Sequence, residues 1–157
     1  MKANSMGNYF DDFTVGEVIT HSLSKTIFES DNNLFSLLTM NHHPLHLNED
    51  FSKKRQHGKI LVIGTLVLSL VVGITVQDIS GKAIANLDYE RITHDAPVFI
   101  GDTIYAKTEI LDIRVSKSKP DRGVVYVETS AFNQYGKKVL TLRRHILIPK
   151  RKGENIS

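Results

Sequence analysis

The sequence contains no cysteine and no tryptophan, and only four of its 157 residues are proline. The absence of cysteine excludes disulfides, thiolate metal sites and cysteine nucleophiles. The opening stretch MKANSMGNYFDDF has no apolar core of the kind that a signal peptide needs, so a cytoplasmic setting is expected. Apolar residues make up 41% of the chain and charged residues 24%, which is ordinary for a globular protein. A chain of this length is expected to form one domain with a core of its own.

Basic residues occur in short clusters, and the formal net charge is only +3. The clusters are KKRQHGK (53–59), KSKPDR (117–122), KK (137–138), RRH (143–145) and KRK (150–152). A domain that binds nucleic acid usually carries a basic helix or face, whereas most of these clusters stand at expected turns and ends. We therefore expect no nucleic-acid partner, and a small phosphorylated ligand fits the pattern better.

The run ILVIGTLVLSLVVGITV, residues 60–76, contains no charged side chain. A membrane-spanning helix needs about 20 predominantly apolar residues, and this shorter run also contains two glycines, two threonines and a serine. It therefore predicts a helix that is buried on all sides within one domain, and no membrane contact is expected.

Helical and extended patterns surround this apolar run. A first strand is predicted over 18–28. A helix follows over 29–40 and ends at NHHP, because proline disfavours the α region for the residue before it. Asn48 is placed to cap a short helix after that loop. Beyond Gly81 the pattern predicts four long strands, which are 82–94, 101–117, 123–136 and 137–149. Within 101–117 the apolar positions change face between Ile110 and Leu111, which predicts a β-bulge.

This order of elements predicts an α+β domain over residues 9–149. A curved antiparallel sheet of about five strands, wrapped around a buried central helix, hides the apolar surface of that helix. This arrangement is the hotdog fold. An open sheet edge remains, so the chain is expected to form a homodimer or a higher homo-oligomer. The N-terminus, 1–8, and the basic tail, 150–157, are expected to be flexible.

Several spaced motifs resemble those of MaoC-like (R)-specific enoyl-CoA hydratases and dehydratases. They are YFDDFTVG (9–16), TMNHHPLH (39–46) and APVFIGDTIYAKTEIL (96–111). The segment SKSKPDRGVVYVETSAFNQYGKKVL (116–140) most resembles hydratases of branched dicarboxylic acyl-CoAs, such as itaconyl-CoA or mesaconyl-CoA. Three positions depart from the family pattern: Asn41 stands where the family has Asp, His43 where it has Asn, and Ile63 where it has His.

The resemblance implies a lyase that adds water reversibly to a 2-enoyl-CoA thioester and needs no cofactor beyond its substrate. Negative charge accumulates on the thioester oxygen, and backbone amides at a helix start can stabilise it. Gly64 and Thr65, at the expected start of the apolar helix, are the candidates. His46 is the candidate proton carrier. Asn41 can orient a water molecule but cannot accept a proton near neutral pH, so His46 works alone or another group assists it.

Other residues are candidates for contacts with the acyl-CoA. The resemblance places a helix serine at Ser69 and cations for the coenzyme phosphates at Lys117, Lys119 and Arg122. His43 could take over a proton-transfer step beside His46. A distal carboxylate on the acyl chain would need a further cation, for which Arg91 and His94 are candidates. Asp31 and Asp50 are alternative acids, although a capping or surface role suits each of them.

Three competing interpretations remain. The first is metal binding by His42, His43 and His46. A catalytic zinc site needs three ligands in fixed geometry, and Pro44 prevents a regular helix from fixing the spacing of these histidines. No metal is therefore expected. An acyl-CoA thioesterase usually carries a carboxylate on the central helix, and residues 60–76 contain none. The third interpretation is a non-catalytic acyl-CoA-binding module that lost its acid at Asn41.

Overall fold

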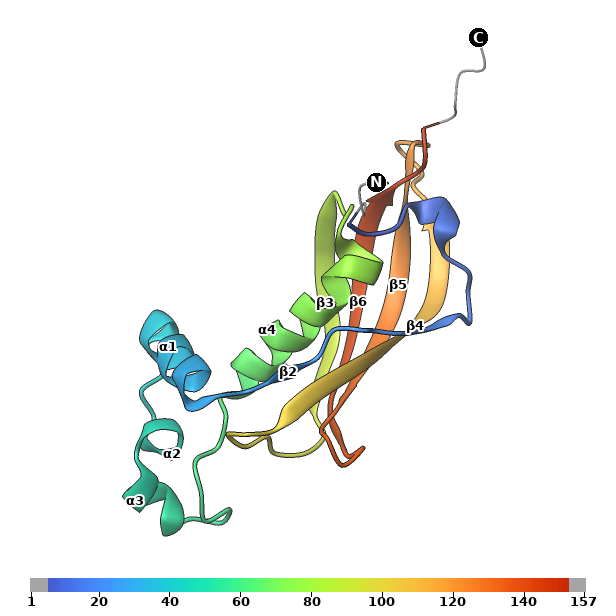
Figure 1. Ribbon diagram of the computed structural model, residues 1–157. Helices are drawn as coiled ribbons and strands as arrows, with labels where there is room; N and C mark the ends of the chain where they lie inside the picture. The colour runs from blue at the N-terminus through green and yellow to red at the C-terminus, as the bar shows by residue number, and fades with distance from the viewer. Residues whose placement is uncertain (1–5, 153–157) are drawn as a thin grey trace, which may run out of the picture.

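The computed structural model describes residues 6–152, which form one antiparallel sheet curved along one side of a central helix (Figure 1). The helical elements are η1 (Phe10–Asp12), α1 (Glu29–Thr39), α2 (Pro44–Leu47), α3 (Glu49–Lys53), α4 (Gly64–Thr75) and the π-helical turn η2 (Val76–Ser80). The strands are β1 (Val18–Thr20), β2 (Lys25–Thr26), β3 (Ala85–His94), β4 (Thr103–Val115), β5 (Arg122–Phe132) and β6 (Lys138–Pro149).

The strand order in the sheet is β1-β4-β5-β6-β3, and β2 also pairs with β4. Every pairing is antiparallel, and α4 lies on the concave face of the sheet (Figure 1). The predicted α+β hotdog architecture is therefore confirmed. The predicted bulge is confirmed as well, since the register of β4 with β5 shifts between Ile110 and Asp112.

The sheet has six strands rather than about five, because the strand predicted over 18–28 is divided. Thr20 pairs with Lys107 and Lys25 with Ile104. Between these two pairs the first segment therefore contains more residues than β4 does, and the pairing is interrupted. The interruption begins at His21, whose buried ring turns inward. His21 Nδ1 lies 2.7 Å from a carboxylate oxygen of Asp78 in η2, and Nε2 lies 2.7 Å from Thr108 Oγ1 on β4. This polar contact ties the first segment to the end of the central helix.

The central helix is shorter and less enclosed than the sequence predicts. It begins at Gly64, because residues 61 and 62 are held in extended conformation by the segment before β4: Leu61 bridges to Phe99, and the Val62 amide donates to the Val98 carbonyl at 2.9 Å. Buried side chains of α4, such as Val67 and Val71, face the sheet, whereas Thr65 and Ser69 are exposed. The prediction of burial on all sides is therefore wrong for the single chain, because the sheet covers only one side of α4.

The space between α4 and the sheet also holds a buried cation. Arg144 on β6 is 2% exposed and donates to Thr75 Oγ1 at 2.8 Å and to Asn86 Oδ1 at 3.1 Å. Its burial lowers the pKa of its guanidinium from the usual value. Thr75 is the last residue of α4, and the carbonyl end of a helix favours positive charge. Arg144 therefore connects the end of the helix to the middle of the sheet.

The two ends expected to be flexible lie partly outside the described residues. Within residues 6–8, the Gly7 amide donates to the Gln77 carbonyl at 2.8 Å, and Asn8 donates to the Asp78 carbonyl at 2.7 Å. Within residues 150–152, Arg151 Nη2 lies 2.6 Å from Asp12 Oδ1. The described parts of both ends thus pack against the same end of the domain.

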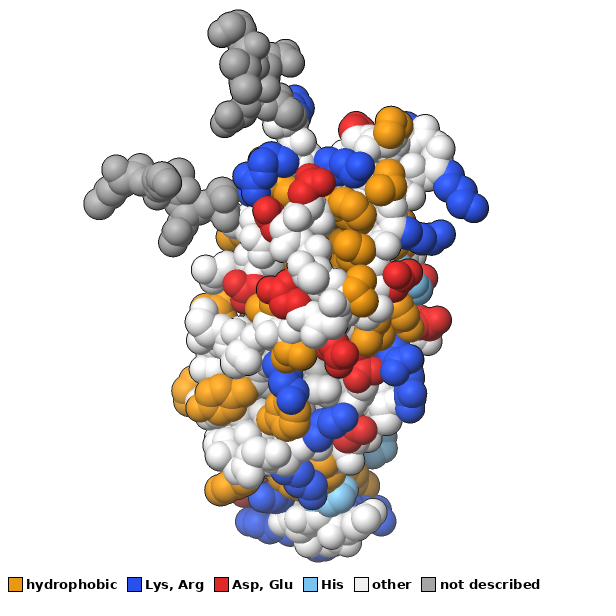
Figure 2. Space-filling view, turned by 90° about the vertical axis from the view of Figure 1, so that its right-hand side faces the viewer, with side chains coloured by type: hydrophobic (Ala, Val, Ile, Leu, Met, Phe, Trp, Pro, Cys, Tyr) orange, Lys and Arg blue, Asp and Glu red, His pale blue; other side chains and the backbone are white. Residues whose placement is uncertain are grey.

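The surface carries charges of both signs. On the face shown in Figure 2, Lys and Arg side chains alternate with Asp and Glu and with hydrophobic side chains. The helices within residues 6–152 are all too short or too polar to cross a membrane.

Candidate functional site

The histidine-rich loop connects α1 to α2 at the end of the molecule where α4 begins (Figure 1). Helix α1 ends where Met40 adopts a left-handed conformation with φ of 60°. Pro44 then takes a first-turn position of α2, where an N–H would have no helical partner. His43 caps this helix, since its Nδ1 accepts a hydrogen bond from the Leu45 amide at 3.1 Å. The loop therefore fixes the start of the short helix that carries His46.

The imidazole of His46 is held by one defined hydrogen bond. Its Nδ1 lies 2.6 Å from the main-chain carbonyl oxygen of Leu61, three residues before α4. Because a carbonyl oxygen only accepts, Nδ1 must carry the proton, and in the neutral ring Nε2 is then the basic nitrogen. No described residue forms a hydrogen bond with Nε2. The half-buried ring is thus oriented by the chain and keeps a nitrogen available for a ligand.

A buried asparagine that the sequence analysis missed holds this arrangement together. Asn32 on α1 is 1% exposed, and its Nδ2 donates to the His46 carbonyl at 3.0 Å. Its Oδ1 accepts from the Ile63 amide at 3.0 Å. One side chain therefore joins α1, the histidine loop and the residue directly before α4.

The beginning of α4 offers main-chain donors. Its N-cap residue, Ile63, has no side chain that could cap the helix. Within residues 6–152, the amides of Gly64 and Thr65 donate to no acceptor. Free amides and the positive end of the helix dipole together stabilise an anionic oxygen. These donors thus lie only a few residues after Leu61, whose carbonyl accepts the hydrogen bond from His46.

A groove of about 380 Å³ borders the beginning of α4. Leu61, Val62, Gly64 and Val67 form one wall, and residues 94–98 form the other. The second wall is held by main-chain hydrogen bonds: the Asp95 amide donates to the Val139 carbonyl at 3.0 Å, and the Val98 carbonyl accepts from the Val62 amide at 2.9 Å. The groove is mainly apolar, and the imidazole of His94 lies against Gly64 within it.

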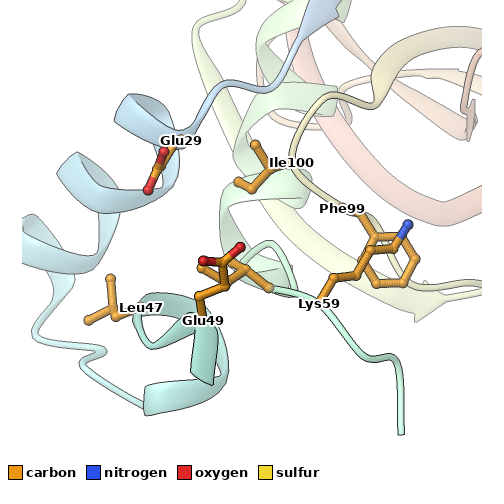
Figure 3. Close-up of a pocket in the computed structure, with 7 residues that line it drawn as sticks. Glu29, Leu47, Glu49, Lys59, Phe99 and Ile100 are labelled. Carbon is orange, nitrogen blue, oxygen red and sulfur yellow. The ribbon is translucent and has the colours of Figure 1, made fainter. Parts of the chain in front are cut away.

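A second pocket of about 310 Å³ lies between α1, α3 and the segment before β4 (Figure 3). The carboxylates of Glu29 and Glu49 both line it, and Lys59 lies over the Phe99 ring with Nζ 4.0 Å from the ring centroid. Two carboxylates of like sign disfavour an anionic ligand. The groove at Gly64 contains one carboxylate, that of Asp95, together with the imidazole of His94.

The other predicted site residues are only partly brought together. Asn41 is half-buried in the histidine loop, and its carbonyl accepts from Ser36 Oγ at 2.8 Å. His43 has its ring centroid 6.1 Å from that of His46. Ser69 lies on the exposed side of α4, one turn after Thr65.

The predicted phosphate-binding cations lie elsewhere. The turn that carries Lys117, Lys119 and Arg122 joins β4 to β5 at the end of the sheet far from the histidine loop (Figure 1). Arg122 is paired there with Asp121, with Nε 2.8 Å from Oδ1. Within one chain the structure does not bring this turn to the site, because the whole length of β4 separates them.

The alternative acids have structural partners. Asp31 accepts from the Phe28 amide at 2.8 Å and from Lys25 Nζ at 2.9 Å, and these contacts hold the pKa of Asp31 below its ordinary value. Asp50 is exposed and pairs with Lys54 at 2.7 Å. Among residues 6–152, no group of three His, Asp or Glu side chains is arranged to hold a metal ion.

Known proteins resemble this chain along most of its length. A mesaconyl-CoA hydratase from Cereibacter sphaeroides is 34% identical over 151 residues, which are 96% of this chain and 43% of that protein. A β-methylmalyl-CoA dehydratase from Chloroflexus aurantiacus is 34% identical over 145 residues, 92% of this chain and 41% of the relative. The chain therefore spans less than half the length of these relatives.

Solved structures agree with the fold. A Chloroflexus aurantiacus protein named as a MaoC domain dehydratase superposes with a TM-score of 0.91 at 33% identity, covering 100% of this chain and 44% of that one. A Mycobacterium tuberculosis protein described as having a double hotdog fold gives a TM-score of 0.86 at 22% identity, covering 96% of this chain and 47% of that one. The resemblance to MaoC-like proteins is confirmed. Because the family model described as mesaconyl-CoA hydratase matches residues 1–156, this chain belongs to the mesaconyl-CoA hydratase family.

Proposed function

We propose that this chain catalyses the reversible addition of water to the double bond of a 2-enoyl-CoA thioester with a short branched or dicarboxylic acyl chain. The observation that carries the proposal is the bond from His46 Nδ1 to the Leu61 carbonyl. It leaves Nε2 as the basic nitrogen and ties the imidazole to a residue three positions before α4, whose first two amides have no acceptor among residues 6–152. The relatives named mesaconyl-CoA hydratase and β-methylmalyl-CoA dehydratase support this substrate class and both directions of the reaction.

The chemistry assigns one task to each group. The amides of Gly64 and Thr65 bind the thioester oxygen, where negative charge develops when water adds to the β-carbon. His46 Nε2 takes a proton from the attacking water as the C–O bond forms at the β-carbon, and the resulting imidazolium donates that proton to the α-carbon, which returns His46 to its neutral form. Asn41 orients the water through its amide. No metal or cofactor is required by this scheme.

A second copy of the chain is part of the proposal. Strand β3 pairs only with β6, so its other edge is open among the described residues. Leu87, Tyr89 and Ile92 on β3 are each more than two-fifths exposed, and an open apolar edge is a ready site for strand pairing. We propose a homodimer through β3, in the cytoplasm. Light scattering during gel filtration gives the mass, and Leu87→Lys with Ile92→Lys should shift it to that of one chain.

The test of the activity is a panel of enoyl-CoA thioesters that includes mesaconyl-CoA, itaconyl-CoA and crotonyl-CoA. Loss of the ultraviolet absorbance of the conjugated thioester reports hydration, and a thiol reagent reports free CoA. The proposal expects hydration without thiol release. Thiol release instead would indicate a thioesterase.

A second candidate function is an acyl-CoA-binding module without catalysis, and Asn41 in place of a carboxylate is the observation that favours it. Calorimetry with a non-reactive acyl-CoA would show binding in either case. Binding with no hydration of any thioester in the panel would therefore support the binding module and contradict the hydratase.

A further inference from the structure

The groove at the beginning of α4 contains an imidazole that the proposed reaction does not use. His94 is the last residue of β3, and its ring lies directly against Gly64. A Cβ atom on Gly64 would come within 2.9 Å of His94 Cε1 and 3.0 Å of Nε2. The two residues can therefore be this close only because residue 64 is glycine.

The ring nitrogens of His94 are available to a ligand. Neither nitrogen forms a hydrogen bond with any residue in 6–152, and the side chain is exposed at the groove. The other ionisable residue of the groove, Asp95, accepts a hydrogen bond from Thr141 Oγ1 at 2.7 Å, and its carboxylate would repel an anion. The remaining lining side chains are apolar.

These surroundings decide what chemistry His94 can recognise. A carboxylate placed in an apolar groove is unfavourable unless a donor binds it. His94 is the one lining side chain, within the described chain, that can donate a hydrogen bond and carry positive charge. Arg91, the other candidate from the sequence, does not line this groove and lies opposite Arg143 on β6.

We propose that His94 binds the distal carboxylate of a dicarboxylic acyl chain whose thioester oxygen lies at Gly64, and that it thereby sets a preference for dicarboxylic over monocarboxylic thioesters. This inference rests on the proposed hydratase function. It adds that the wall opposite α4, rather than the histidine loop, selects the acyl group.

The experiment compares kcat/KM for mesaconyl-CoA, which has a distal carboxylate, with kcat/KM for crotonyl-CoA, which has none. His94→Phe keeps a ring against Gly64 but removes the donor, and His94→Gln keeps a donor without the ring. We expect the mesaconyl-to-crotonyl ratio to fall about 10- to 100-fold in His94→Phe, the loss expected for one hydrogen bond to a charged group. His94→Gln should retain more of the ratio.

The outcomes separate the two proposals. A His94→Phe protein that is folded by circular dichroism and keeps the wild-type ratio overturns the role of His94. Equal losses on both thioesters also overturn it, because they would show a general effect on the groove. A wild-type protein that hydrates crotonyl-CoA without favouring mesaconyl-CoA overturns the inference but leaves the hydratase function in place. A wild-type protein that hydrates neither thioester overturns both.

Discussion

Asn32 donates its side-chain amide to the main-chain carbonyl of His46, and the same side chain accepts from the amide of Ile63. His46, the proposed proton carrier, and the start of α4 are therefore positioned by one buried group. The separation between imidazole and helix start depends on α1 as much as on the histidine loop.

The first prediction concerns this bridge. Asn32→Asp keeps an acceptor for Ile63 but removes the donor to His46, and it brings a carboxylate against a carbonyl. We expect the free energy of unfolding to fall by about 1–3 kcal/mol, as for other buried polar groups left unpaired. We also expect kcat to fall while KM changes little, since the residues proposed to contact the ligand remain in place. Urea unfolding and steady-state kinetics measure the two effects. Asn33→Asp, at the exposed neighbouring position, is the matched control.

The second prediction concerns His46. His46→Ala should lower kcat for hydration by about 10²- to 10⁴-fold, the usual contribution of a positioned acid or base, while binding of a non-reactive acyl-CoA persists. His42→Ala is the control, because His42 is exposed and its side chain contacts no polar partner in the described chain. Full hydration activity in His46→Ala would refute its role as the proton carrier.

The third prediction separates two roles of Asn41. If its amide orients the attacking water, Asn41→Asp should lower kcat, because a carboxylate cannot donate a hydrogen bond to that water. Stopped-flow measurement with crotonyl-CoA is sensitive enough to detect either change. A gain in activity would show instead that the site lacks an acid, which is the premise of the binding-module interpretation.

The fourth prediction uses two glycines of α4. Gly64→Ala should push the His94 ring out of position, and because this exposed ring can move aside, the variant should be neutral or destabilised by less than about 1 kcal/mol. Gly73→Ala should be neutral or stabilising by up to about 1 kcal/mol, because a Cβ there meets nothing within 4 Å. Thermal unfolding of the two variants in parallel checks the contrast. Equal effects would show that contact with His94 is not what requires glycine at position 64.

The fifth prediction is a pH dependence. The Phe28 amide and the Lys25 ammonium lower the pKa of Asp31 in the folded chain, so its carboxylate adds stability above the unfolded pKa of about 3.9. That stability is lost as the pH falls through the lower, folded pKa. Asp31→Asn should therefore be less stable than the wild type at pH 6, and the difference should shrink below about pH 4. Urea unfolding at several pH values tests this, and a constant difference would contradict it.

Local patterns in the sequence predict the long strands and the bulge after Ile110, because each depends on neighbouring residues. The apolar run predicts a helix from residue 60, and its later start at Gly64 depends instead on contacts of Leu61 and Val62 with the segment before β4. The bridge made by Asn32 could not be predicted in this way, since a single asparagine on a helix has no periodic signal and its partners lie 14 and 31 positions away. The break at His21 was missed for the same reason, because its cause is Asp78. The turn at Lys117 matches the family in sequence, yet sequence spacing does not show that β4 carries it away from His46.

The open edge of β3 links folding to association. If two copies pair there, ordering that strand is a bimolecular event, and its contribution grows with the amount of protein by mass action. The unfolding temperature should then rise as the solution is made more concentrated. Dilution would destabilise β3, with His94 at its end, before the other strands of the sheet. The preference for dicarboxylic acyl chains should therefore decrease in dilute samples that are still folded.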